Sequence, residues 1–181
     1  QKFSLNGIIN SPSEVSLSPD GKKIFFTVFA TNKFEQYTLT VPFDISSLDT
    51  STKIEFDLNA GSDDVNLAQG HAFNSDGTKF FVVSKTEDAT QLNAHSLSRP
   101  YDLSSDISQI ADDGIAWVTA FSAGDGAVHA QDITFNNDGT KMYLFDAGHN
   151  TQGDGGVVEY DLSVPYDTST ASFVNELVTS D

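Results

Sequence analysis

Apolar side chains along this chain gather in three short runs separated by polar loops. The segment 23–30 places apolar residues on both faces of a predicted strand, and the runs 80–83 and 142–145 repeat that pattern. A short two-sided run rich in aromatic and β-branched residues is typical of a strand covered on both sides, at the centre of its sheet. Each run follows an Asp-Gly pair, which favours a tight hairpin because Gly adopts positive φ without strain. The pairs are Asp20-Gly21, Asp76-Gly77 and Asp138-Gly139.

A second motif, Pro-aromatic-Asp, follows each Asp-Gly turn in the same order. The separations are 21, 23 and 26 residues, counted from Gly21 to Pro42, Gly77 to Pro100 and Gly139 to Pro165. Loops between the two motifs therefore differ in length while the strands around them keep their pattern. Two independent motifs that recur in one order indicate a structural repeat.

Each repeat is predicted to contain four antiparallel strands. The first precedes the Asp-Gly turn, the second is the two-sided run, and the third leads into the Pro-aromatic-Asp motif. The fourth lies at 52–58, within 107–121, and at 171–178. The turn glycines recur at intervals of roughly 60 residues, a period that suits propeller blades. We therefore predict an all-β fold of three β-propeller-like blades (14–67, 68–128 and 129–181) after a leading outer strand and linker at 1–13.

The repeats resemble the β-propeller repeats of bacterial and viral surface proteins. Those read roughly aromatic-x-x-Asp-Gly-Thr-Lys-apolar-aromatic, then Tyr-Asp-Leu-Ser-x-Pro-aromatic-Asp; the segments 135–143 and 160–167 show both halves. The repeats are also distantly similar to lactonase-like and Tyr-Val-Thr-Asn propeller repeats. The resemblance covers nearly the whole chain. Since its residues serve turns and packing, it implies a fold and names no activity.

Three blades leave a propeller ring open, because such rings usually close with about four to eight blades. Either the chain belongs to a longer array, or several copies join, or the blades stack without closing. The leading strand, with Phe3, Leu5 and Ile8, aligns with the fourth strand of an absent earlier blade. These three side chains are therefore predicted to pair with the exposed edge of another molecule.

The charge and composition narrow the classes of partner. Nine Lys and Arg against 26 Asp and Glu give a net charge of −17, which argues against nucleic acid as a partner. No apolar run reaches the ~20 residues that a membrane helix needs, so no membrane insertion is expected. Absence of Cys excludes disulfides and thiolate chemistry. A chain that starts at Gln1 suggests either a processed mature start or a piece of something longer. We favour the first, a secreted form located outside the cell or on a cell or virion surface.

One loop has the composition of a calcium site. Asp146, Asn150 and Asp154 offer oxygen ligands separated by Gly, which suits the flexible shell of Ca²⁺. The alternative is an ordinary Gly-rich hairpin loop. No other cofactor and no catalytic residue is predicted. His71 and His95 are interpreted as packing residues on strands. The lysines after the Asp-Gly turns are interpreted as solvated ends: Lys22, Lys23, Lys79 and Lys141.

These observations predict a non-catalytic, extracellular structural or adhesive protein. Its blades would assemble with other copies of the chain in a filament, surface layer or virion appendage, with strand donation as a candidate mechanism. The alternative is a binding module that holds a glycan or other cell-surface ligand at its loop tips. A third hypothesis is a lactonase-like hydrolase, which would need groups from several blades to converge on a central channel.

Overall fold

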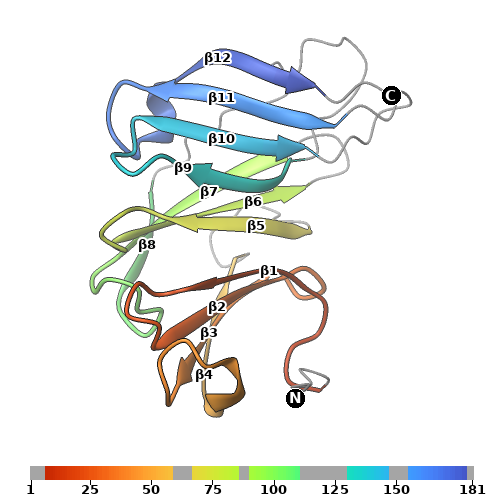
Figure 1. Ribbon diagram of the computed structural model, residues 1–181, viewed down its shortest axis with the longest axis vertical. Coiled ribbons are helices and arrows are strands. Elements are labelled where there is room, and N and C mark those ends of the chain that lie inside the picture. The colour runs from red at the N-terminus through yellow and green to blue at the C-terminus, as the bar shows by residue number, and fades with distance from the viewer. Residues whose placement is uncertain (1–6, 59–66, 86–89, 111–129, 147–154, 179–181) are drawn as a thin grey trace.

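The computed structural model describes residues 7–58, 67–85, 90–110, 130–146 and 155–178 of the 181-residue chain. They form three antiparallel sheets of four strands each, and the strands of each sheet follow chain order. The sheets are stacked along the long axis, with the N-terminal sheet at one end and the C-terminal sheet at the other (Figure 1). This arrangement confirms the predicted all-β, propeller-like fold of three four-stranded blades.

The blades are named by their order in the chain. Blade 1 contains β1 (Pro12–Leu17), β2 (Lys23–Val28), β3 (Lys33–Leu39) and β4 (Leu48–Asp57). Blade 2 contains β5 (Ala68–Phe73), β6 (Lys79–Lys85), β7 (Thr90–Leu97) and β8 (Ile107–Gln109). Blade 3 contains β9 (Ala130–Phe135), β10 (Lys141–Asp146), β11 (Gly156–Leu162) and β12 (Ala171–Val178). Short 3₁₀ helices, η1 (Ile45–Ser47) and η3 (Thr168–Thr170), precede β4 and β12.

The two repeated motifs recur together because they pack on each other. In each blade the Gly of the Asp-Gly turn has a φ of about 70° and lies under the ring of the Pro-aromatic-Asp motif, where a Cβ would overlap that ring. The N–H of the aromatic residue donates to the Gly carbonyl at 2.9 Å in all three blades. The side chain of the Asp in each turn accepts the backbone N–H of the residue two positions later. Those acceptors are Asp20, Asp76 and Asp138.

The hydrophobic core is divided between the junctions of neighbouring blades. Phe25 and Phe34 of blade 1 pack against Phe80 and Val82 of blade 2. The opposite face of blade 2, with Phe81, joins a second cluster built mainly from blade 3. A third cluster lies on the outer face of blade 1 and includes Ile9, Phe26 and Tyr37. Blade 2 is therefore apolar on both faces because a neighbouring blade covers each of them.

Two expectations need qualification. Phe145, in a run expected to be covered on both sides, is 46% exposed, because its side chain lies on the face of blade 3 that no described blade covers. Of the predicted leading strand, Phe3 and Leu5 lie outside the described residues. Residues 7–11 form turn and bend, and Ile8 packs beside the cluster on the outer face of blade 1.

No helix among the residues placed here has the length and hydrophobicity required to cross a bilayer.

Candidate functional site

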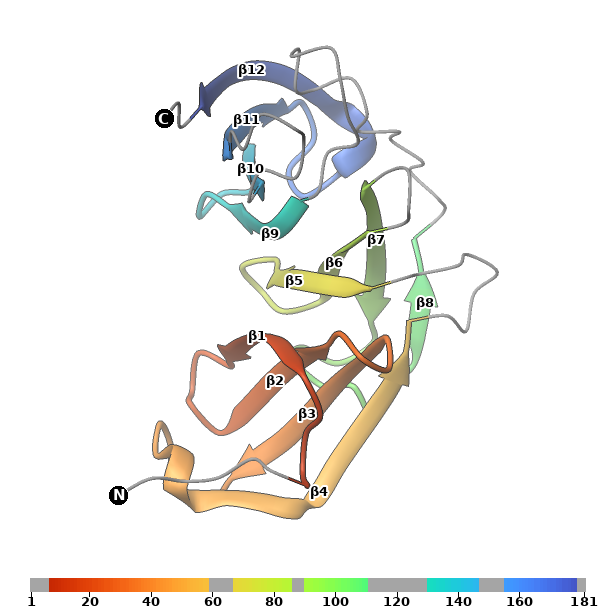
Figure 2. The same cartoon turned by 90° about the vertical axis from the view of Figure 1, so that its right-hand side faces the viewer.

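The first strands of the three blades lie next to one another and carry different residues at one repeat position. β1 contacts β5, and β5 contacts β9, so these strands form the inner seam of the stack (Figure 2). Alignment of the three repeats on their turn glycines places Glu14 of β1, Gly70 of β5 and Asp132 of β9 at the same position. The seam therefore has an acidic residue on either side of a glycine.

Gly70 allows the two carboxyl groups to meet. A Cβ at position 70 would lie 2.6 Å from the Cα and the Oδ1 of Asp132 and 2.6 Å from the carbonyl oxygen of Gln131, closer than atoms can approach. Glu14 reaches across β5, where its Oε2 accepts the backbone N–H of His71. At the far side it hydrogen-bonds the side chain of Asp132. Carboxyl groups from blades 1 and 3 thus meet over the first strand of blade 2.

The environment raises the pKa of Glu14 to about 8. Burial is the largest cause, and the charge and hydrogen bond of Asp132 act in the same direction, whereas the His71 N–H opposes them. Two adjacent carboxylates avoid both being ionised, so Glu14 holds a proton at neutral pH. A quarter (25%) of the Glu14 side chain remains exposed to solvent.

His71 fixes the geometry of the seam. Its ring is fully buried, with Nε2 2.6 Å from Ser16 Oγ and Nδ1 2.8 Å from Thr27 Oγ1. Burial lowers the pKa of His71 to about 3, so the ring is neutral and joins blade 2 to blade 1 through two hydroxyl groups. Ser13 adds a bond from its Oγ to the carbonyl of Gln69 at 2.6 Å. The seam is therefore held by specific polar contacts as well as by apolar packing.

The Glu14–Asp132 pair has the properties of an acid–base pair. A protonated carboxyl group can donate a proton near neutral pH, and a neighbouring carboxylate can accept one. Asp132 is held in position by the N–H of Ile133, which donates to its Oδ1 at 2.8 Å. The arrangement suits proton transfer during hydrolysis.

The calcium ligands predicted from sequence are not brought together by anything the structure describes. Asp146 ends β10, whereas Asn150 and Asp154 lie outside the described residues. Within the part of the chain that is placed, no three His, Cys, Asp or Glu side chains are grouped as metal ligands. The calcium site stays a prediction. His95 fills the packing position shared with Tyr37 and Tyr160, stacked on the Phe80 ring at 4.7 Å.

Sequence reasoning missed Glu14 and Asp132. The signal was available, since acidic residues occupy one position of the first strand in two of three repeats. Their meeting depends on the close approach of β5 and β9 at Gly70, which only the packed structure shows.

Comparison with known proteins supports the fold. No family model matches the chain, and no curated protein matches it in sequence. A "putative 6-phosphogluconolactonase" from Bacteroides fragilis is similar in structure, with a TM-score of 0.54, 18% identity, and coverage of 93% of this chain and 42% of its own. The periplasmic gluconolactonase of Pseudomonas aeruginosa has a TM-score of 0.55, 14% identity, and coverages of 92% and 40%.

A nidogen/laminin complex is also similar, with a TM-score of 0.52, 10% identity, and coverages of 90% and 47%. This chain therefore spans less than half the length of these neighbours. At such identities the likeness shows only the fold, a β-propeller-like arrangement, and leaves the surface-protein repeat type unsupported.

The neighbours also correct the functional prediction. Several of the similar structures carry the names of gluconolactonases, which are hydrolases. The predictions of a non-catalytic structural or adhesive protein and of no enzymatic activity are therefore wrong. They rested on the incomplete ring and on turn motifs, and neither feature reports on the chemistry of side chains along the inner seam.

Proposed function

We propose that this chain provides a hydrolase site of the lactonase type, with Glu14 and Asp132 as its acid and base. The observation that carries the proposal is the contact between these two carboxyl groups on the inner seam, where the pKa of Glu14 is raised to about 8. The names of the gluconolactonase neighbours support the same reaction class. Because the chain spans 42% and 40% of those neighbours, further blades would supply the remaining walls of the site.

The proposed reaction is hydrolysis of a lactone ring. The Asp132 carboxylate accepts a proton from a water molecule as its oxygen attacks the lactone carbonyl carbon. When the bond between that carbon and the ring oxygen breaks, the Glu14 carboxyl group donates its proton to the ring oxygen. The product is the open hydroxy acid. The proton taken by Asp132 then returns Glu14 to its protonated form, so the pair is restored after each turnover.

The charge of the chain favours an uncharged substrate. A net charge of −17 repels a phosphorylated lactone, and no Lys or Arg in the described part of the chain contacts either carboxyl group of the pair. We therefore propose a neutral sugar lactone, as in the name of the P. aeruginosa neighbour. An extracytoplasmic location is part of the proposal, supported by the periplasmic origin of that neighbour.

The test is hydrolysis of glucono-δ-lactone by the purified chain, measured with a pH indicator against the spontaneous rate. Glu14→Gln and Asp132→Asn should each lower the rate by roughly 10²-fold or more, as expected for loss of a general acid or base. The rate of the unchanged chain should fall as the pH rises above about 8, where Glu14 loses its proton. The 6-phosphorylated lactone should react more slowly.

Glu55→Gln serves as the matched control, because Glu55 is exposed on β4 and pairs only with Lys53 among the described contacts. Equal rates for the control and both site variants would refute the proposal. No rate above the spontaneous one would refute it as well.

A further inference from the structure

The hydroxyl group of Ser16 lies beside the carboxyl pair on the inner seam. Ser16 follows Glu14 by two residues on β1, so both side chains leave the strand on the face toward blade 2. β1 runs next to β5 along this seam (Figure 2). Ser16 is half-buried, and the one hydrogen bond of its side chain among the described contacts joins Oγ to Nε2 of His71 at 2.6 Å. The role of this hydroxyl group therefore depends on which nitrogen of the ring carries the hydrogen.

Thr27 decides the tautomer of His71. Thr27 is fully buried, and within the described part of the chain its hydroxyl group hydrogen-bonds only to Nδ1 of His71, at 2.8 Å. Oε2 of Glu14 is 3.6 Å from the same nitrogen, which is too far for a hydrogen bond. A buried hydroxyl hydrogen without an acceptor is unfavourable, because it has lost its bond to water. The Thr27 O–H therefore donates to Nδ1, which is the ring nitrogen without a hydrogen.

The tautomer leaves the hydrogen of Ser16 unused. Burial lowers the pKa of His71 to about 3, so the ring is neutral and carries one hydrogen at neutral pH. Because Nδ1 is the acceptor, that hydrogen is on Nε2 and is donated to Ser16 Oγ. A hydroxyl group holds a single hydrogen, and Oγ uses a lone pair toward His71. Among the described residues, no acceptor for the Ser16 hydrogen is present.

The bonds from Thr27 through His71 to Ser16 form a chain that runs from the blade junction to the seam. Thr27 and the His71 ring are fully buried, whereas Ser16 is half-buried. Since Oγ accepts from the buried ring on one side, its own hydrogen is directed away from that ring. Ser16 is therefore the exposed end of the chain, and it presents a hydrogen-bond donor of fixed direction.

The second blade junction shows that such a polar chain is not needed to join two blades. Alignment on the turn glycines places three apolar residues at the positions of Ser16, His71 and Thr27, namely Ala72, Ile133 and Val83. These three side chains belong to one apolar cluster between blades 2 and 3. Apolar packing fills the same positions there without hydrogen bonds. The polar chain of the first junction therefore points to a role beyond packing.

The imidazole ring that holds Ser16 also borders the carboxyl pair. Glu14 Oε2 accepts the backbone N–H of His71 and lies near Nδ1, whereas Ser16 Oγ lies at Nε2. The Ser16 hydroxyl group and the Glu14 carboxyl group are thus at the two nitrogens of one ring. A lactone whose ring oxygen is placed at Glu14 would bring a substituent of its own ring to Ser16.

We infer that Ser16 donates a hydrogen bond to a ring hydroxyl group of the substrate, and so selects hydroxylated lactones over lactones without hydroxyl groups. His71 and Thr27 are positioning residues, since they fix the direction of the Ser16 hydrogen through Nε2 and Nδ1. The inference rests on the proposed hydrolase function, because it concerns the substrate of the same site.

Hydrolysis of two lactones with the same ring size tests the inference. Glucono-δ-lactone carries hydroxyl groups on its ring, whereas δ-valerolactone carries none. Ser16→Ala should lower kcat/KM for glucono-δ-lactone about 3- to 10-fold, mainly through KM, because it removes one neutral hydrogen bond. The value for δ-valerolactone should change less than about twofold, since that substrate offers Ser16 no partner. Ser16→Thr keeps a hydroxyl group on a residue that favours strands, so it should keep the preference.

Ser108→Ala is the matched control. Ser108 is an exposed serine on β8, the outermost strand of blade 2. Its replacement should leave the ratio of the two kcat/KM values unchanged. Far-ultraviolet circular dichroism checks that each variant is folded.

Nitrogen-15 NMR of the imidazole rings tests the tautomer without any substrate. At neutral pH the His71 ring should carry its hydrogen on Nε2, and its signals are identified by their loss in His71→Gln. The measurement uses the unchanged chain, so it decides the matter even if Ser16→Ala does not fold. A hydrogen on Nδ1 would overturn the inference, because the Ser16 hydrogen would then be donated to Nε2.

The kinetic outcomes separate this inference from the hydrolase proposal. If Ser16→Ala lowers the rate for both lactones equally, or for neither, the inference is wrong and the hydrolase proposal stands. If the unchanged chain hydrolyses neither lactone above the spontaneous rate, the hydrolase proposal is wrong and the inference falls with it.

Discussion

Single residues at equivalent repeat positions give this protein its candidate chemistry. Glu14, Gly70 and Asp132 share one position of the first strand, yet only the glycine lets the other two meet. His71, next to Gly70, is buried and neutral and serves the fold. Residues with a proposed catalytic role and residues with a structural role are therefore neighbours on the same seam. The pKa of Glu14 is raised and the pKa of His71 is lowered, so the pH dependence of stability distinguishes the two residues experimentally.

Glu14→Gln should change how stability depends on pH. The folded state raises the pKa of Glu14 from 4.5 to about 8, so it binds more protons than the unfolded state between these values. Glu14 therefore lowers stability as the pH rises through this window. The amide that this substitution introduces has no proton to lose in this range. The melting temperature of Glu14→Gln, relative to that of the unchanged chain, should therefore rise from pH 5 to pH 8. A constant difference would contradict the raised pKa.

His71 should make the protein sensitive to acid. Its pKa is lowered from 6.5 to about 3, so between these pH values His71 is protonated in the unfolded state and neutral in the folded state. Stability should fall as the pH drops below about 6.5. His71→Gln should be less stable at neutral pH, yet its melting temperature should fall less steeply between pH 6.5 and 4. Parallel curves for the two proteins would refute this cause.

At the scale of the element, each turn contributes to more than its own blade. The Asp-Gly turn, the aromatic ring of the Pro-aromatic-Asp motif that packs on it, and the lysine after the turn form one unit that recurs in every blade. The interpretation of the lysines as solvated ends is wrong for Lys23 and Lys79, which hold the next blade through its backbone carbonyl. Lys141 is paired with carboxylates. The sequence of one turn does not reveal that its lysine contacts a residue of another repeat.

Gly77→Ala tests the packing of the two turn motifs. Alanine at this position would have a φ of 72° and its Cβ would overlap the Tyr101 ring. We expect a loss of about 2 kcal/mol relative to Gly7→Ala, which corresponds to about 4 to 8 °C in melting temperature for a chain of this size. Gly7 is the control, because its φ is 81° and nothing lies within 4 Å of its Cβ position. Equal losses of stability for Gly77→Ala and Gly7→Ala would contradict the packing of the Tyr101 ring on Gly77.

At the scale of the whole molecule, net charge is a general destabilising term. With a charge of −17, folding brings many carboxylates together, and their repulsion is screened by salt. The melting temperature should therefore rise with sodium chloride up to several hundred millimolar and then level off. Potassium chloride should have the same effect, which separates screening from specific ion binding. A melting temperature independent of salt would contradict this view.

Calcium at matched ionic strength tests the predicted loop site. Binding at Asp146, Asn150 and Asp154 should raise the melting temperature beyond the effect of screening, and a chelator should reverse the rise. Asp154→Asn should remove that extra rise. If calcium acts no differently from magnesium at equal ionic strength, the loop is an ordinary Gly-rich connection.

The sequence by itself determined the fold class and the repeat. Asp-Gly turns, two-sided apolar runs and the Pro-aromatic-Asp motif are local signals, because backbone conformation and the alternation of side chains depend on near neighbours. The predicted strand at 171–178 coincides with β12 (Ala171–Val178) for this reason. Four strands per blade and their order followed from the same local patterns.

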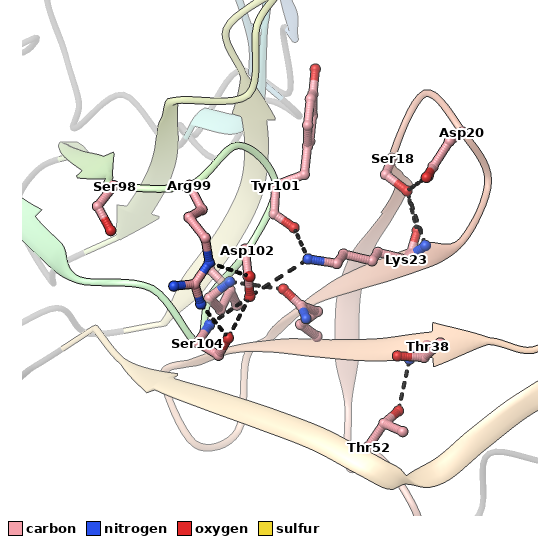
Figure 3. A network of polar contacts seen from close by, with 12 residues as sticks. Ser18, Asp20, Lys23, Thr38, Thr52, Ser98, Arg99, Tyr101, Asp102 and Ser104 are labelled. Atoms are coloured by element: carbon pink, nitrogen blue, oxygen red, sulfur yellow. Dashed lines mark hydrogen bonds and ion pairs between the residues drawn. The ribbon is translucent and has the colours of Figure 1, made fainter.

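Only the tertiary structure decided which repeats meet and through which residues. Lys23 donates to the carbonyl oxygen of Tyr101 (Figure 3), and Lys79 donates to that of Tyr166; these partners are 78 and 87 residues apart in the chain. The Glu14–Asp132 contact joins blades 1 and 3 over a still longer separation, so no local pattern contains both partners. Whether a carboxyl group is solvated or raised in pKa depends on burial, and burial is a property of the packed sheets.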